Sequence, residues 1–229
     1  MSLIYIYPYP FAEKEELNGQ YVDYLRFGFV CNPWDRLFSC FKDKIQPADF
    51  DNEEYIKGAA RPLHHCSTLF DGGMSFDEFV DVVYSIPDAK AEHHFSSQLF
   101  QMTDSLGNLL VNYLGRFEQI NEGLKEITQK KGIPFVNFPH LHKTKRKSYH
   151  EYYTDELIEK VRKRFSADID FFSCEFDESN NADPIGFVND KLKEKLSSPT
   201  IMAFILKHKN LELGVAIDGF KRNKNIHIE

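Results

Sequence analysis

Short apolar runs and longer amphipathic stretches alternate along this chain, and the short runs predict strands. The runs from Leu3 to Tyr7, from Leu25 to Cys31 and from Leu109 to Leu114 are rich in aliphatic or aromatic residues, and a proline or glycine follows each one closely. Two further runs, Thr200 to Leu206 and Leu211 to Ile217, flank a polar turn and predict two short strands near the C-terminus.

Apolar residues at three- and four-residue spacing predict helices between these strands. Asn32 is a good N-cap and Pro33 suits the first helical position, so a helix should begin there. Ser75 to Glu78 forms a capping box at the start of a second helix. The longest helix is predicted from Thr154 to Phe172, and a shorter one from Ile185 to Leu196.

Strands that alternate with helices predict an α/β fold with three layers, a parallel sheet flanked by helices on both faces. The chain has 229 residues, of which 42% are hydrophobic, enough for one sizeable core but not for two ordinary enzymes. An acidic, asparagine-rich stretch at 177–184 is the clearest candidate boundary. We expect a main domain over residues 1–176 and a C-terminal extension over 177–229, and whether the extension packs on the main domain stays open.

The charge and the N-terminal pattern argue against several classes of protein. The formal net charge is −7, which argues against a general nucleic-acid or anionic-membrane binder. The N-terminus lacks the pattern of a signal peptide, and no apolar run approaches the roughly 20 residues of a spanning helix. A cytoplasmic protein without a membrane span is therefore predicted.

Histidine and cysteine occur in clusters that invite a metal hypothesis. His64, His65 and Cys66 form one cluster, and His93 with His94 forms another. Neighbouring side chains are expected to point in different directions, and the chain shows no spacing of four ligands. No metal site is therefore predicted.

The pattern with the most chemical content begins at the predicted start of the first helix. Its spacing is set by seven residues, Asn32, Pro33, Arg36, Leu37, Ser39, Phe41 and Lys44. This segment resembles the 3′-phosphate-binding segment of the carbohydrate sulfotransferases. Stretches at 74–79, 94–98, 113–118 and 139–176 match the same family in the same order, so the resemblance covers about two thirds of the chain.

The resemblance implies a P-loop-like (Rossmann-like) fold and the cofactor 3′-phosphoadenosine 5′-phosphosulfate (PAPS) as the sulfate donor. Asn32, Arg36 and Ser39 would lie at the cofactor's 3′-phosphate, with Ser39 as the hydroxyl that binds it. Lys143 and Arg146 would add positive charge to the same group. The plainer interpretations are an ordinary helical serine at position 39 and a solvated loop at 143–147.

A hydroxyl acceptor needs a general base, and two residues of the matched stretches are candidates. His94 matches a histidine of the family, and Glu118 follows a predicted strand at the edge where catalytic groups of parallel sheets collect. Each residue also has a structural interpretation, because His94 could be an ordinary loop histidine and Glu118 could cap a helix.

The chain departs from the family pattern at two positions. Cys31 stands where the family has an arginine on the 3′-phosphate, a loss of about 2 to 4 kcal/mol if nothing replaces it. We interpret Cys31 as a buried structural thiol. The segment after Tyr7 also lacks the lysine of the family's 5′-phosphosulfate loop, although Lys14, Lys42 or a partner chain could supply one. Either the chain is shortened there or it no longer carries out the reaction.

Three functions from different classes follow from these patterns. The first is a sulfotransferase that moves a sulfuryl group from PAPS to a carbohydrate hydroxyl. The second is a degenerate sulfotransferase fold that binds a carbohydrate or a protein without catalysis, and the third is an unrelated α/β interaction protein. Self-association through an exposed hairpin edge in the C-terminal extension is left open.

Overall fold

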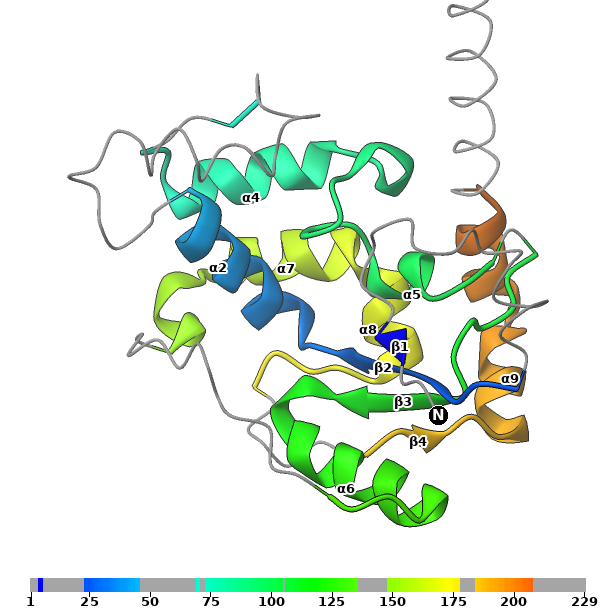
Figure 1. The fold of residues 1–229 in the computed structure, drawn as a ribbon. Coiled ribbons are helices and arrows are strands. Elements are labelled where there is room, and N and C mark those ends of the chain that lie inside the picture. The colour runs from blue at the N-terminus through cyan, green and yellow to red at the C-terminus, as the bar shows by residue number, and fades with distance from the viewer. Residues whose placement is uncertain are drawn as a thin grey trace, which may run out of the picture.

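The computed structural model of the chain describes residues 4–5, 23–45, 69–70, 73–104, 106–135, 148–177 and 184–207. The predicted strand from Leu211 to Ile217 lies outside these residues, as do Lys14, Lys143 and Arg146. The fold is mixed α/β, with a small sheet and many helices (Figure 1).

The sheet has four short strands in the order β1 (Ile4–Tyr5), β2 (Arg26–Val30), β3 (Tyr113–Arg116) and β4 (Gly186–Phe187). The first three are parallel, and β4 pairs antiparallel with β3. The prediction of a purely parallel sheet is therefore wrong at this edge, because the chain returns from the C-terminal side to pair with the start of β3. The predicted strand from Leu109 to Leu114 is paired in the sheet only from Tyr113 onward. The residues before Tyr113 form a loop, in which Leu109 makes an isolated bridge to Thr103.

Helices on one face of the sheet form the larger core. They are α2 (Pro33–Lys44), α4 (Phe76–Ser85), α5 (Gln98–Gln101), α7 (Asp155–Arg164) and α8 (Ser166–Phe172). Val30 and Leu114 point into this core from the strands, and Trp34, Phe38 and Phe79 are fully buried in it. Alternate residues of a strand face opposite ways, so Phe27 and Tyr113 point to the other face. There they meet α6 (Ile120–Lys131).

The face covered by α6 is closely packed because two glycines admit one aromatic ring. A Cβ atom added at Gly115 of β3 would lie 2.3 Å from the Phe29 ring, and one at Gly123 of α6 would lie 2.8 Å from it. Phe29 of β2 thus occupies the space that side chains at both positions would need. These glycines allow α6 to lie close against the sheet.

Local helix signals are confirmed at two of the predicted N-termini. The Asn32 side chain caps α2, with Pro33 as its first residue. Ser75 and Glu78 form the predicted capping box of α4. Short 3₁₀ turns, η2 (Asp88–Lys90), η3 (Phe117–Gln119) and η4 (Tyr149–Tyr152), connect the longer elements.

The predicted long helix from Thr154 to Phe172 is two helices. Phe165 has φ −112° and ψ 27°, which ends α7 and starts α8 in a new direction. The break leaves Asp168 of α8 fully buried, where it accepts backbone hydrogen bonds from α5. Helical periodicity alone cannot reveal such a break, because both pieces keep an apolar stripe.

The segment after the acidic stretch contributes to the main core. The predicted helix from Ile185 starts later, as α9 (Asp190–Leu196), because β4 precedes it. The predicted strand from Thr200 to Leu206 is wrong, since residues 199–207 are helical. Ile201 and Ile205 are four residues apart, so a helix places both of them in the core, and both are buried. A short apolar run of this kind suits a strand equally well, which is why the sequence pattern did not distinguish the two.

Candidate anion site at the β2–α2 junction

The turn from β2 into α2 presents a helix N-terminus at the carboxyl edge of the parallel strands. The Asn32 Oδ1 atom accepts a hydrogen bond from the Trp34 N–H at 3.1 Å, and Asp35 adds a negative charge to the first turn. Ligands of open α/β sheets bind outside this edge of the sheet. The junction is therefore the place where the fold favours a ligand.

Gln98, at the start of α5, holds the residue just after β2. Its Oε1 accepts from the Cys31 N–H at 2.8 Å, and its Nε2 donates to the Cys31 carbonyl at 2.9 Å. The side-chain amide thus pairs with Cys31 as a neighbouring strand would, and it fixes the chain between β2 and α2. The sequence had placed Gln98 in a matched stretch without giving it a role.

Residues from two other matched stretches also converge on the junction. The Glu118 carboxylate accepts from the Asn32 N–H at 2.9 Å, and the Asn32 side chain donates to the Glu175 carbonyl at 2.8 Å. The Tyr153 hydroxyl donates to the Trp34 carbonyl at 2.9 Å. Stretches far apart in the sequence therefore meet at one turn.

These contacts use several backbone donors of the α2 N-terminus. The Asn32 N–H bonds Glu118, Pro33 has no N–H, and the Trp34 N–H bonds the Asn32 side chain. An anion at this helix would therefore depend on the helix dipole and on side chains further along α2.

Arg36 lies one turn into α2, and its guanidinium joins the helix to the turn before α5. It donates to the Ser96 carbonyl and to the His93 carbonyl, both at 2.7 Å. Ser39 follows three residues later, on the same side of the helix, and is half-buried. The structure thus brings Asn32, Arg36 and Ser39 together along α2, with Arg36 clamped to its neighbours.

The turn before α5 carries two histidines around one buried carboxylate. The His94 Nδ1 atom lies 2.7 Å from Glu92 Oε2, and His93 Nδ1 contacts Glu92 Oε1. The two imidazoles are in contact, with ring centroids 4.0 Å apart and ring planes tilted by 35°. The expectation that adjacent histidines point apart is wrong here, because both rings turn to the same carboxylate.

Glu92, His93 and His94 also have the residue types and spacing of a metal site, with ligand atoms within 4.8 Å of one another. The contacts to the carboxylate account for this proximity. Burial acts to raise the pKa of Glu92, but hydrogen bonds and positive charge from the histidines outweigh it and lower that pKa. Burial, followed by the charge of His94, lowers the pKa of His93.

Two buried carboxylates fix the start of α5. Asp168 accepts from the Gln98 N–H at 2.7 Å and from the Leu99 N–H at 2.9 Å. Asp88 accepts from the Ser97 N–H and from its hydroxyl, and forms an ion pair with Arg164 at 2.8 Å. Burial raises the pKa of Asp168 to about 6, although both backbone donors oppose the shift. These carboxylates hold Gln98 against Cys31.

Cys31 is a poor nucleophile in this setting. Burial raises the pKa of its thiol to about 12, the charge of Glu118 adds to the effect, and Arg36 only partly opposes it. Among the described cysteines, Cys31, Cys40 and Cys174 form no disulfide. The interpretation of Cys31 as a structural thiol agrees with this environment.

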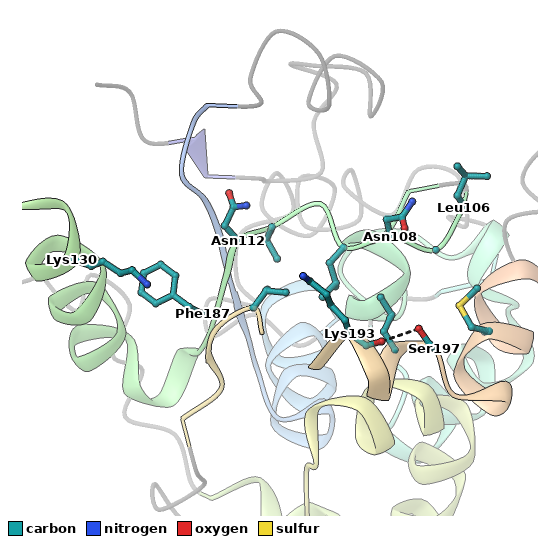
Figure 2. A pocket seen from close by; sticks show the side chains of 13 residues that line it. Leu106, Asn108, Asn112, Lys130, Phe187, Lys193 and Ser197 are labelled. Carbon is teal, nitrogen blue, oxygen red and sulfur yellow. Dashed lines mark hydrogen bonds between the residues drawn. The ribbon is translucent and has the colours of Figure 1, made fainter. Parts of the chain in front are cut away.

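A separate cavity of about 590 Å³ lies at the opposite edge of the sheet (Figure 2). The loop before β3, Phe187 of β4 and residues of α9 line it. Lys130, at the end of α6, places its ammonium group 3.6 Å from the centre of the Phe187 ring. Because this cavity adjoins the amino end of β3, it is distinct from the β2–α2 junction.

A comparison with known protein families identifies the family of this chain. A family model described as the sulfotransferase family matches residues 8–175, more than half of the chain. The chain belongs to the sulfotransferase family. The match includes the β2–α2 junction and every residue that bonds to it above. No curated protein and no solved structure gave a significant match to this sulfotransferase family member.

Five of the seven predicted site residues are among those that the structure describes. Asn32, Arg36 and Ser39 lie along α2, with Glu118 bonded to its N-terminus and His94 in the turn that Arg36 holds. The roles of Lys143 and Arg146 stay predictions. Glu92 and Asp168 were not predicted, because their contacts with this region depend on the tertiary fold. Among the described residues, no helix has the length and apolar character to cross a membrane.

Proposed function

We propose that this protein transfers a sulfuryl group from PAPS to a carbohydrate hydroxyl, on a P-loop-like fold. The observation that carries the proposal is the β2–α2 junction, which lies inside the family match and at the ligand-binding edge of the sheet. The helix dipole of α2 favours an anion at this end. Membership of the family supports sulfuryl transfer in general. PAPS as the donor and a carbohydrate as the acceptor are the proposed details.

The 3′-phosphate of the cofactor is assigned to the side of α2 that carries Ser39. The backbone donors at the N-terminus are largely used, so a hydroxyl further along the helix is the better contact. In the proposal, Lys143 and Arg146 approach the same phosphate. Arg36 acts mainly through its clamp on the turn before α5, because two of its donors are bonded there.

A second candidate function has its own support. The protein lacks the family's phosphate arginine at position 31, and the contacts of Asn32 and Arg36 leave fewer groups for an anion. These features favour a degenerate member that binds a carbohydrate or a protein without transfer. Affinity for the cofactor separates the two candidates.

The test is calorimetric titration with 3′-phosphoadenosine 5′-phosphate, the desulfated product. Ser39→Ala should weaken binding by about 10- to 150-fold, the value of one hydrogen bond to a charged group. Ser85→Ala is the matched control, because that hydroxyl bonds the Val82 carbonyl on α4. Equal affinity in wild type and Ser39→Ala would remove Ser39 from the site. No binding by wild type up to millimolar ligand would favour the non-catalytic function.

A further inference from the structure

One carboxylate holds both the backbone and the side chain of His94, each through one hydrogen bond. Glu92 Oε2 accepts from the His94 backbone N–H at 2.9 Å and lies 2.7 Å from the Nδ1 atom of the ring. The Glu92 side chain is only 4% exposed, while that of His94 is 22% exposed. A buried carboxylate thus holds an imidazole that solvent or a ligand can reach.

The charge of Glu92 decides which ring nitrogen carries the proton. Hydrogen bonds from His94 lower the pKa of Glu92 despite its burial, so the carboxylate is ionised at neutral pH. An ionised carboxylate only accepts hydrogen bonds. Nδ1 must therefore be the donor, and in the neutral ring Nε2 keeps its lone pair.

The same turn is tied to the helix of the candidate anion site. Arg36 bonds the carbonyls of His93 and Ser96, on either side of His94. The charged and titratable groups that face the cluster come from α2 and from the turn itself. They are Arg36, Cys40, Asp43, Lys44 and His93. Lys44 forms an ion pair with Asp43.

We infer that Glu92 is a positioning residue that holds His94 as the general base of the transfer reaction. The inference rests on the proposed sulfuryl transfer and deepens it. Glu118, the other candidate base, is engaged at the α2 N-terminus through the Asn32 N–H. In His94, the hydrogen bond between Nδ1 and Glu92 leaves the lone pair on Nε2. A histidine general base takes a proton through such a lone pair and is oriented by a partner on its other nitrogen.

The proton and the electron pairs balance in this step. The acceptor hydroxyl oxygen attacks the sulfur of PAPS, forming one S–O bond while the S–O bond to the 5′-phosphate breaks. The bond's electrons leave with the phosphate of 3′-phosphoadenosine 5′-phosphate. His94 Nε2 takes the hydroxyl proton and later releases it to solvent, while Nδ1–H stays bonded to Glu92.

The first arm of the test needs no substrate. Long-range ¹H–¹⁵N spectra of the full-length protein report the tautomer of each histidine ring. Wild type should show His94 with its proton on Nδ1, and Glu92→Gln should shift the population toward Nε2–H, because a neutral amide can donate as well as accept. Glu194→Gln, on the exposed face of α9, removes one negative charge as the matched control and should leave the spectrum unchanged. An unchanged His94 tautomer in Glu92→Gln would overturn the inference.

The second arm separates positioning from simple structural support. In sulfate transfer from labelled PAPS, Glu92→Gln should lower kcat at least about tenfold with KM for PAPS within about threefold of wild type. Equal losses in kcat for Glu92→Gln and Glu194→Gln would overturn the positioning role. A wild type without transfer activity, but with the expected tautomer change, would remove the proposed function and leave the Glu92–His94 pair established.

Discussion

At the scale of single residues, the β2–α2 junction is shaped by groups that are paired and at least half-buried. Cys31 has both backbone groups bonded by Gln98 and a thiol whose pKa burial raises to about 12. The fully buried Asp168 accepts a hydrogen bond from the Gln98 N–H and so fixes the backbone of Gln98. The chemistry at each position therefore depends on its neighbours more than on its residue type.

Cys31 should react slowly with alkylating agents. A pKa of about 12 in place of 9.0 lowers the thiolate fraction at pH 8 by roughly 1000-fold. Modification by iodoacetamide, followed peptide by peptide with mass spectrometry, should be slower by at least about 100-fold in the folded protein than in 6 M guanidinium. Similar rates in the two states would show that the thiol is accessible and ionised.

Asp168 should make stability depend on pH in a defined direction. Its pKa is about 6 when folded against an ordinary 3.8, so the folded state holds the proton more tightly. The stability from this group is full below about pH 4 and is lost as the pH rises through 6, by roughly 3 kcal/mol in total.

The measurement is urea unfolding of wild type and Asp168→Asn between pH 4 and 7. The difference between their free energies of unfolding should shrink as the pH rises. Asp170→Asn, exposed on the same helix, is the control and should show no such trend. A difference that stays constant across this range would contradict the raised pKa of Asp168.

At the scale of elements, close contact between α6 and the sheet depends on Phe29 between two glycines. Gly115→Ala should destabilise the protein by about 1 to 3 kcal/mol, because the new Cβ would lie 2.3 Å from the Phe29 ring. Phe29→Leu should recover part of that loss in the double variant, as shown by a thermodynamic cycle from chemical unfolding.

Gly28→Ala provides the comparison on the neighbouring strand. Its Cβ would lie 2.9 Å from the flexible end of Met102, which can move aside. A smaller loss of stability is expected there. Strictly additive effects of Gly115→Ala and Phe29→Leu would show that the ring does not occupy the glycine's space.

At the scale of the whole molecule, the segment over 184–207 belongs to the core of the sulfotransferase-like fold. It adds β4 to the sheet (Figure 1). Leu196, Ile201 and Ile205 of this segment are buried in the larger core. The family match ends at residue 175, so this part of the core lies beyond the matched region. The stability of the protein is therefore expected to depend on residues beyond the matched region.

Two neighbouring residues test whether this segment packs on the core. Ile205 is fully buried, and Ile205→Ala should lower the free energy of unfolding by about 2 to 5 kcal/mol. Leu206 is 43% exposed, and Leu206→Ala should change it by less than about 0.5 kcal/mol. Equal effects in thermal or urea unfolding would show that the 199–207 helix is not packed on the core.

The sequence by itself determined features whose causes are local. The start of α2 at Pro33, the capping box at Ser75 and the strand before Asn32 each follow from residues within one turn or one strand. The motif that indicates the family is also local, since it lies along one helix.

Only the tertiary structure decided the features that join distant segments. Cys31 bonds Gln98, 67 residues away, and Asn32 bonds Glu118 and Glu175 at separations of 86 and 143 residues. The break at Phe165 and the helix over 199–207 likewise depend on what packs against them. Periodicity and capping describe one segment at a time, whereas burial and long-range hydrogen bonds are properties of the folded chain, and they set the site.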